Sequence, residues 1–323
     1  MNTSYLGLRL ASPVVVGSSP YTSCKTNIER CVRHGAGAVV LKSIFEEQVL
    51  RHAAVFDYVP QGMGDEGEYL ESYLGDHYKL RFLDLIRDAR STGVPVIASI
   101  NCISAGEGWV EYAAAMADAG ASALELNIFL QPVDPELSSE ALEAAYVGVV
   151  GRVVEAVRIP VSVKLPMRLT NTLGMARRLW RVGARGVVLY NRFFEPDIDI
   201  ERMAFVRSDP FSRPSELRNV LRSAALCASL VPELDVAVST GVHDGAAAVK
   251  ALLCGANAVQ LCSAIHYHGY DVIGRIDRFI DAWARRHEFG SVEEFCGRMR
   301  YDDENSDYFQ RVQYMKYFPR DTE

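Results

Sequence analysis

The sequence lacks any apolar run that approaches the roughly 20 residues of a membrane-spanning helix. Its N-terminus, MNTSYLGLRLASP, lacks the basic start and the long apolar stretch of a signal peptide. It also lacks an excess of positive charge, because the formal net charge is −7. Bulk attraction to nucleic acid or to an anionic membrane is therefore unfavourable, and we expect neither as a partner.

The seven cysteines include no CxxC pair and form no cluster with histidine. An odd, dispersed set argues against a disulfide framework and against a zinc site. We therefore expect reduced thiols in a cytoplasmic protein, with most cysteines acting as small core residues, and no bound metal.

The chain does have enough apolar residues for a large core, since 49% of its 323 residues are hydrophobic. Four apolar segments share one pattern, and each follows an amphipathic stretch that is typical of a helix. These segments are GAGAVVL (35–41), GASALEL (120–126), GARGVVL (183–189) and GANAVQL (255–261). The leading glycine is expected to end the helix in a left-handed conformation, and the apolar run to form a strand buried on both faces.

A second kind of apolar segment alternates with the first along the chain. These segments are SPVVVG (12–17), VPVIAS (94–99), IPVSVK (159–164) and LDVAVS (234–239). Eight strands separated by helices predict the α/β class and a (β/α)8 TIM barrel that uses most of the chain. A doubly wound open sheet is the competing fold. However, no GxGxxG motif follows the first strand, and the even spread of eight units favours closure.

Two segments fall outside this repeat. The predicted barrel covers residues 1–290, with an aromatic and acidic insertion at about 51–78 that suits a lid or a subunit contact. Residues 291–323 are predicted to form a C-terminal helical extension, whose aromatic residues would pack on the barrel or on a partner subunit. A solvated tail is the alternative, because the run YDDENSD is acidic.

Two lysines, Lys42 and Lys164, stand at the ends of otherwise apolar predicted strands. In barrels the chemistry gathers at the carboxyl ends of the strands. An unpaired buried ammonium is costly, so each lysine is expected to meet an anion or to lose its proton. An ion pair with a barrel carboxylate such as Glu125 is the alternative for one of them, whereas two together favour an anionic ligand.

The last two strands lead into segments that suit a phosphate. Barrels often bind phosphate on the loops after strands 7 and 8. The sequence STGVHDG places Gly241 where backbone amides can face an anion, and CSA at 262–264 adds a hydroxyl and further amides. His243 and Asp244 are expected to cap the following helix.

With these motifs the chain resembles the dihydroorotate dehydrogenase family, nearest its soluble class 1 enzymes. Through that family it is similar to the pyrimidine-binding barrel of dihydropyrimidine dehydrogenase. The resemblance spans residues 3–300 and rests on the small-residue turn after the first strand and on LKS, ELN, VKLP, STG and QLCSA. It implies an FMN-dependent oxidoreductase that acts on CH–CH groups. It also implies a small-molecule substrate, an electron acceptor that the sequence does not identify, and a homodimer.

The resemblance further implies roles for individual residues. The implied cofactor-binding residues are Ser18, Ser19, Lys42, Ser43, Asn101, Asn127, Lys164, Gly241, Val242, Ser263 and Ala264. Among them, Lys164 would lie beside the N1–C2 edge of the flavin, where a fixed ammonium stabilises the negative charge of the reduced form. The last four would hold the phosphate. The implied substrate-binding residues are Lys42, Asn127, Asn191 and Arg192.

The loop after the fourth strand departs from the family pattern. The family reads Asn-Leu-Ser-Cys-Pro-Asn there, and its cysteine removes a proton from the substrate. In this chain residues 127–132 read NIFLQP, so the base position is Leu130, which cannot titrate, and Pro132 replaces the substrate-binding asparagine. The sequence thus predicts a kept flavin half, an altered dihydroorotate half and no assigned catalytic base.

Other titratable residues near strand ends have no spacing argument for a catalytic role. Asp134, Cys102, Tyr21 and His266 are each interpreted as structural until geometry places them in a site. Arg192 is the better candidate, because its guanidinium can grip a carboxylate with two hydrogen bonds. A surface ion pair with Glu195 or Asp197 is its alternative.

Two other functions stay open from the sequence. One is a lyase in which Lys164 or Lys42 forms a Schiff base with a phosphorylated carbonyl substrate. The other is a flavin-binding barrel without turnover, which an apolar loop at the base position would also suit. A yellow protein excludes the first, and resistance to reduction by candidate substrates supports the second.

Overall fold

The structure is a computed structural model that describes residues 1–45, 79–102, 108–130, 134–192, 196–206 and 209–309. The insertion predicted at about 51–78 lies outside the described residues. In the described part, no helix combines the length and the apolar character needed to cross a membrane.

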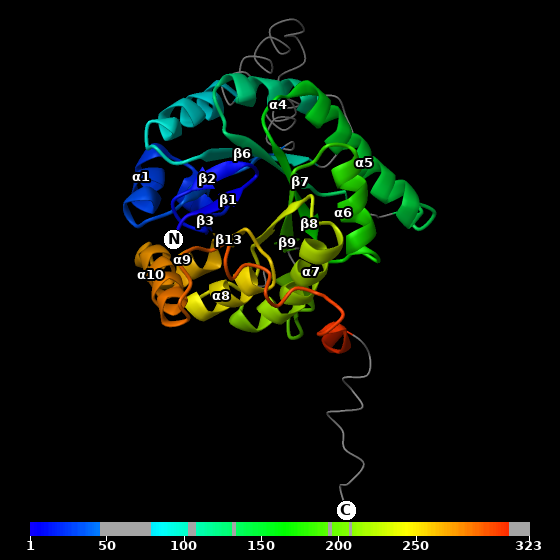
Figure 1. Cartoon of the computed structure of the whole chain (residues 1–323). Coiled ribbons are helices and arrows are strands. Elements are labelled where there is room, and N and C mark those ends of the chain that lie inside the picture. The colour runs from blue at the N-terminus through cyan, green and yellow to red at the C-terminus, as the bar shows by residue number, and fades with distance from the viewer. Residues whose placement is uncertain (46–78, 103–107, 131–133, 193–195, 207–208, 310–323) are drawn as a thin grey trace, which may run out of the picture.

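Eight parallel strands form a closed barrel with helices around it (Figure 1). The strands are β3 (Val14–Val16), β4 (Ala38–Val40), β6 (Val96–Cys102), β7 (Ala123–Ile128), β8 (Val161–Pro166), β9 (Gly186–Asn191), β12 (Asp235–Val238) and β13 (Ala258–Leu261). Closure comes from two pairings of strands distant in sequence, β13 with β3 and β4 with β6. Each strand overlaps one of the eight predicted apolar segments, so the predicted TIM barrel is confirmed.

The helices lie between the strands, as the amphipathic stretches predict. They are α1 (Lys25–Arg33), a helix over residues 79–90, α4 (Gly108–Asp118), α5 (Ser139–Ala156), α6 (Thr172–Arg181), α7 (Leu217–Leu230), α8 (Gly245–Leu253), α9 (Ser263–His268) and α10 (Asp271–Arg286). The glycines that lead the four repeated segments all have φ between 95° and 98°. Only glycine adopts this region without strain, so each one turns the chain from a helix into the next strand.

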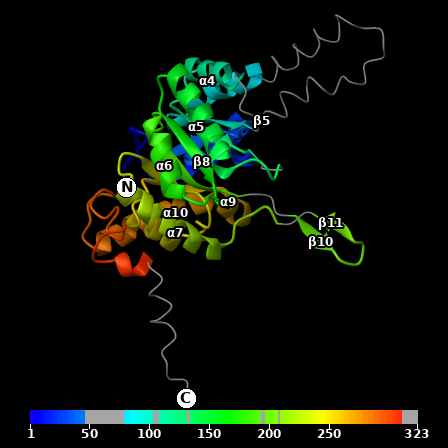
Figure 2. The ribbon, with the colours of Figure 1, turned by 90° about the vertical axis from the view of Figure 1, so that its right-hand side faces the viewer.

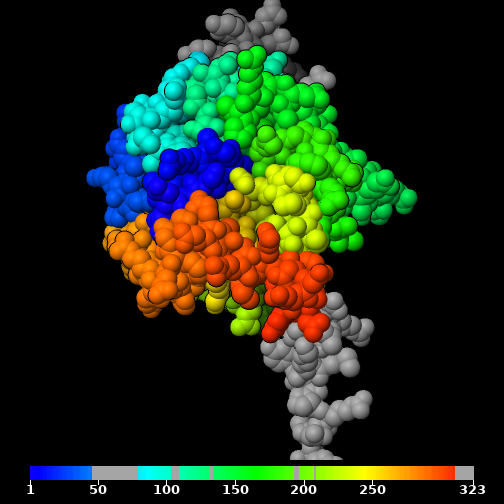
Figure 3. Space-filling model, in the orientation of Figure 1, coloured from blue at the N-terminus to red at the C-terminus, as the bar shows by residue number. Residues whose placement is uncertain are grey.

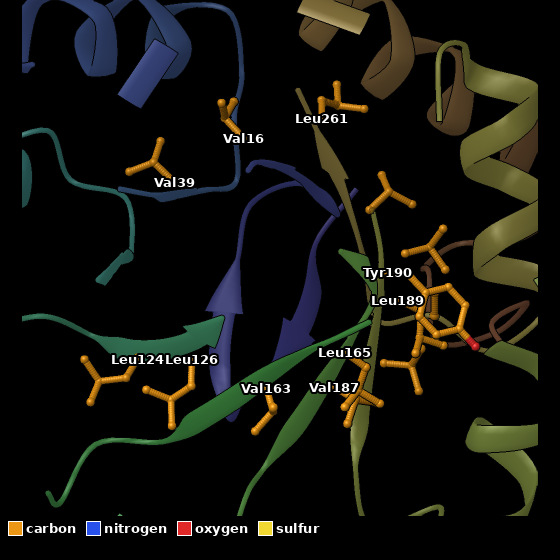
Figure 4. Close-up of a cluster of buried hydrophobic side chains, with 14 of the residues drawn as sticks. Val16, Val39, Leu124, Leu126, Val163, Leu165, Val187, Leu189, Tyr190 and Leu261 are labelled. Carbon is orange, nitrogen blue, oxygen red and sulfur yellow. The ribbon is translucent and has the colours of Figure 1, made fainter. Parts of the chain in front are cut away.

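The apolar side chains of the strands divide between two cores. The larger core lies between the strands and the helices and includes Leu124, Leu126, Val163 and Leu165 (Figure 4). The smaller core lies inside the barrel and includes Val15, Ala38, Val40, Ala123 and Val188, among others. Because successive strand residues point to opposite faces, this division determines which polar residues point inward. Glu125, Asn127, Ser162 and Lys164 share the parity of the inner core.

One end of the barrel is closed by the N-terminal hairpin of β1 (Thr3–Tyr5) and β2 (Leu8–Leu10). Tyr5, Leu6 and Leu10 belong to the inner core, and Figure 3 shows the N-terminal residues filling the centre of this face. The sequence reasoning did not predict this hairpin. With one end closed, the carboxyl ends of the strands at the other end are the open side of the barrel.

Further short elements lie outside the eight strands and the helices of the barrel. They are η1 (Pro20–Thr22), β5 (Ile44–Phe45), β10 (Asp197–Asp199), β11 (Ala204–Val206), η3 (Pro214–Glu216) and η4 (Ser306–Phe309). Strands β10 and β11 form a hairpin that stands away from the barrel (Figure 2). Of the predicted extension over 291–323, the described residues 291–309 form turns and η4. The division of the chain into barrel and extension stays a prediction.

Candidate active site

The polar strand ends converge at the open end of the barrel. In the strand register, Asn101 of β6 lies opposite Asn127 of β7, and Asn127 lies opposite Lys164 of β8. The side-chain amide of Asn191, at the end of β9, donates to the Asn127 carbonyl oxygen over 2.8 Å. Four of the residues predicted to bind cofactor or substrate therefore stand side by side on adjacent strands.

Three serine hydroxyls connect the other side of the barrel mouth. The Oγ atoms of Ser18 and Ser43 are 2.9 Å apart, and those of Ser43 and Ser99 are 2.8 Å apart. The Ser43 amide also donates to Ser18 Oγ over 2.9 Å. This series of hydroxyls links the ends of β3 and β4 to the middle of β6. It holds Ser18 and Ser43, both predicted at the cofactor, in one fixed arrangement.

Lys164 is connected to Glu125 through Gln260. The Lys164 ammonium donates to Gln260 Oε1 at 3.4 Å, and Gln260 Nε2 donates to Glu125 Oε2 at 2.5 Å. A direct ion pair between a strand-end lysine and Glu125 was the alternative considered from the sequence, but a glutamine separates the two groups. Gln260 was not predicted as a site residue. Its signal was a long polar side chain at an inward position of an apolar strand.

Lys42 lies at the end of β4 with its ammonium 4.2 Å from the centre of the Phe45 ring. Burial lowers the pKa of Lys42, because a charged amine is less stable away from water. Lys42 also lines a cavity of about 450 Å³, together with Cys24, Arg81 and Phe82. A second cavity, of about 490 Å³, lies at the opposite end where β8, β9 and β12 begin, and it is remote from the lysines.

Cys262, which precedes α9, is affected by the charges of both lysines. Burial raises the pKa of the Cys262 thiol, while the charge of Lys164, the polar side chain of Ser19 and the charge of Lys42 act against that rise. Ser19 itself is buried and begins η1. The sequence reasoning assigned no site role to Cys262.

The loops after β12 and β13 pack closely together. Gly241 has φ of 83°, and a Cβ added there would lie 2.4 Å from the Leu217 nitrogen, so no other residue fits. The Ser263 hydroxyl accepts a hydrogen bond from the Ser212 amide at 2.9 Å. Val242 and Ala264 are buried, so only their backbones could face a ligand.

Asp244 and His243 have different roles in this region. Asp244 accepts from the Ala247 amide at 2.8 Å and caps α8, as predicted. The His243 ring instead lies 3.0 Å from the Ser212 hydroxyl, so the capping role expected for His243 is wrong. The physical reason is that Ser212, from a segment 31 residues earlier, supplies a buried partner for the ring.

The guanidinium of Arg192 is bonded to other residues of the protein. Its guanidinium donates to the Pro210 carbonyl at 2.7 Å and to Glu216 Oε1 at 3.1 Å. Its ion-pair partner is thus Glu216 of η3, while Asp197 and Glu195 were the partners considered from the sequence. The role of Arg192 as a substrate anchor stays a prediction, and an anionic substrate would compete with Glu216 for it.

The segment after β7 is apolar and tied to its surroundings. The Phe129 amide donates to the Cys102 carbonyl at 2.7 Å, and the Leu130 amide donates to the Tyr146 hydroxyl at 3.3 Å. The Leu130 side chain packs against the core between strands and helices. Gln131 and Pro132 lie outside the described residues.

The other titratable candidates occupy positions of different kinds. The Tyr21 hydroxyl is 3.4 Å from His266 Nδ1 at an exposed position, and the His266 ring stacks on Phe211 with centroids 3.7 Å apart. Asp134 is exposed, and its carboxylate accepts from the Glu136 amide. Cys102 is buried within β6. None of these contacts indicates a base at the substrate.

Comparison with known proteins places the chain among dehydrogenases. No protein-family model matches it. The catalytic subunit of dihydroorotate dehydrogenase B (NAD(+)) from Methanocella arvoryzae is 30% identical over 276 residues, which cover 80% of this chain and 85% of that protein. The protein of the same name from Methanothermobacter thermautotrophicus is 28% identical and covers 92% of this chain and 97% of its own length. Chloroplastic dihydropyrimidine dehydrogenase (NADP(+)) from Arabidopsis thaliana is 24% identical, over 94% of this chain and 78% of that protein.

A closed (β/α)8 barrel with lysines and amides gathered at its strand ends, and relatives that are named dehydrogenases, together define a barrel oxidoreductase. The chain belongs to the dihydroorotate dehydrogenase family.

Proposed function

We propose that the protein binds FMN non-covalently at the open end of the barrel and transfers a hydride between flavin N5 and a C–C bond of a small, anionic, pyrimidine-like substrate. The observation that supports this most is the pair Lys42 and Lys164. Among the described residues, no carboxylate lies within 4.0 Å of either ammonium. Two ammonium groups at strand ends without a carboxylate partner suit an anionic group.

The residues present fit FMN in their chemistry. The ammonium of Lys164, connected to Gln260, would lie beside the ring edge that becomes negative on reduction. The backbones of Gly241, Val242 and Ala264, with the Ser263 hydroxyl, would hold the phosphate. When bound, FMN supplies a hydride acceptor and donor, which no side chain of the protein can supply.

The substrate half of the site is proposed from the two paired amides and Lys42. Asn127 and Asn191 orient each other through one hydrogen bond and keep further donors and acceptors for a pyrimidine-like ring. Lys42 would balance a substrate carboxylate or ring anion. Dihydroorotate itself would be oxidised slowly, because Leu130 cannot accept a proton and a general base typically contributes 10²–10⁴-fold in rate.

The direct test is FMN binding by purified protein, followed by quenching of flavin fluorescence and by the visible absorption spectrum. We expect one FMN per chain and a yellow protein. A folded protein that leaves the fluorescence of added FMN unchanged would overturn the proposal. Anaerobic titration with dihydroorotate and with fumarate then tests turnover, and a flavin that resists every candidate substrate would indicate a flavin-binding barrel without turnover.

A Schiff-base lyase is the second candidate, and the environment of Lys42 favours it. Burial lowers the pKa of Lys42, which makes the neutral, nucleophilic amine more available. The Phe45 ring acts in the other direction, because a ring face stabilises the ammonium. Borohydride trapping of a carbonyl substrate on Lys42, in a protein that stays colourless with FMN, would establish the lyase instead.

We also propose a cytoplasmic homodimer. The hairpin of β10 and β11 supports self-association, because Ile198 and Phe205 pair across it while both stay more than half exposed. Ile200 and Met203 near its tip are also exposed, at 79% and 88%. Contiguous exposed apolar residues are typical of an interaction surface. Light scattering should give twice the chain mass, and Phe205→Ser should shift the protein toward monomer.

A further inference from the structure

Glu125 is a buried carboxylate in the middle of the barrel. Its side chain is fully buried, and Gln260 is 1% exposed. Within the described residues, Glu125 Oε2 accepts from Gln260, while Oε1 has no hydrogen-bond partner. An incompletely bonded buried carboxylate is destabilising, so its position above the inner core calls for a reason other than stability.

The chemistry of the two end groups determines the orientation of the amide between them. Glu125 Oε2 accepts the hydrogen bond, so Gln260 turns its NH2 toward Glu125. An ammonium only donates, so Gln260 must turn its oxygen toward Lys164. Both requirements select the same orientation of Gln260, and the observed contacts satisfy both.

The glutamine also keeps the two charges apart. Glu125 lies opposite Ser162 in the register, whereas Lys164 is two residues further along β8. A carboxylate in direct contact with Lys164 would neutralise its ammonium. An intervening amide transmits the orientation of the carboxylate and leaves the ammonium free to face a second anion.

We infer that Glu125 and Gln260 are positioning residues that hold the Lys164 ammonium toward the bound cofactor and so increase the preference of the site for reduced over oxidised flavin. This inference rests on the proposed FMN site. It assigns a function to a buried glutamate and glutamine that do not themselves reach the open end of the barrel.

Two variants of Glu125 distinguish its role in positioning the Lys164 ammonium from the effect of its own charge. Glu125→Gln removes the negative charge and lets the Gln260 amide adopt either orientation. Loss of a negative charge alone would make reduction of a nearby flavin easier and raise its reduction potential. Loss of a fixed position for the Lys164 ammonium would instead lower the reduction potential. We expect the affinity for reduced relative to oxidised FMN to fall about threefold, a decrease of about 15 mV for a two-electron couple.

Glu125→Asp keeps the charge but withdraws the carboxylate by one methylene from Gln260. We expect the same decrease in potential, and Cys227→Ser, a buried control on α7 outside the barrel, should leave the potential unchanged. Unfolding curves establish that each variant is folded, and either Glu125 variant alone suffices for the test. A raised potential in Glu125→Gln, or an unchanged potential in Glu125→Asp, would overturn the inference.

A flavin-free measurement distinguishes failure of this inference from failure of the FMN proposal. The chain has only six lysines, so nitrogen-15 relaxation of the side-chain ammonium groups can resolve Lys164, with Lys164→Arg to assign its signal. We expect the Lys164 ammonium to be ordered in the unmodified protein and clearly more mobile in Glu125→Asp. Equal mobility in both proteins would overturn the positioning role, whether or not FMN binds.

Discussion

In one set of positions at the barrel mouth, Ser18, Ser43 and Ser99 form a continuous series of hydroxyls, and Lys164 of β8 is held by a buried amide and carboxylate. In the segment after β7, the strand between β6 and β8, Leu130 packs against the outer core and offers no titratable group. The first region has polar groups with fixed orientations inside a buried environment. The second has apolar contacts at the position where the family has its base.

The difference shows that the two halves of the mouth are under separate constraints. Groups that hold a cofactor must be oriented before it binds, and a hydrogen-bonded network does this. The segment after β7 can change without disturbing that network, because its hydrogen bonds go to Cys102 and Tyr146 and Leu130 packs on the outer core. Under the proposed function, a new substrate or lost turnover is therefore compatible with FMN binding.

The largest expected effect comes from rebuilding the loop after β7. Leu130→Cys combined with Gln131→Pro and Pro132→Asn restores the family pattern, and flavin reduction by dihydroorotate should accelerate by about 10²-fold, within the range for a general base. Leu130→Cys alone should give little rescue, because Pro132 lacks the amide of the family's asparagine and leaves the substrate poorly oriented, and because a thiol packed on the core also ionises poorly. Burial raises the pKa of Cys31 and of Cys227 to about 12 in this protein.

The measurement is anaerobic flavin reduction in a stopped-flow instrument. The matched control carries Leu130→Ala with the same two flanking changes, so it has the rebuilt backbone without a base and should stay slow. Rapid reduction of the unmodified protein would show that a base exists elsewhere, and the contrast between the two halves would then disappear.

A smaller effect is expected from Lys164→Ala in the cofactor half. Hydrogen bonds to charged groups contribute about 1.5–3 kcal/mol, so reduced FMN should bind at least about tenfold more weakly relative to oxidised FMN. Potentiometric titration of the bound flavin gives this ratio. Lys25→Ala is the control, since Lys25 is half-exposed and pairs with Asp88 at 3.5 Å. Equal potentials in the two variants would place Lys164 away from the flavin.

Arg192 and Glu216 test whether the substrate half begins at the end of β9. Breaking their partly exposed ion pair with Arg192→Met or Glu216→Gln should cost about 1 kcal/mol of unfolding free energy in each case, as measured in urea. If Arg192 anchors a substrate carboxylate, only Arg192→Met should raise the dihydroorotate concentration for half-maximal flavin reduction. The same rise in Glu216→Gln would indicate a purely structural pair.

The smallest expected effect is a pH dependence of stability from His243. Burial, and then the charge of His268, lower the pKa of His243 below its ordinary value of 6.5, against the opposing influence of Ser212, Asp244 and Glu216. Between the folded pKa and 6.5 the unfolded chain binds more protons, so the unfolding free energy should decrease as the pH falls through 6.5. Urea unfolding at about pH 7.5 and 5.5 measures this change. A His243→Gln variant with the same loss on acidification would assign it to other groups.

Much of the fold follows from local sequence patterns. The eight strands are recognisable because each is a short apolar run after a glycine or proline turn, and strand periodicity directs Lys164 and Asn127 inward. The cap of Asp244 on α8 also follows from sequence, because a capping side chain bonds an amide three residues away. The hairpins of β1–β2 and β10–β11 were missed, since strands of three residues leave almost no periodic signal.

The site depended on the sequence for its residue types and on the tertiary structure for its partners. Lysines at strand ends predict a nearby anion whatever the arrangement of the strands, because an unpaired buried ammonium is costly. Closure of the barrel brings Gln260 onto Glu125, 135 residues earlier, and the path of the segment between β9 and α7 brings Arg192 onto Glu216 of η3. Such pairs form when strands and loops distant in the chain are placed at hydrogen-bond distance, and short-range periodicity contains no information about that distance.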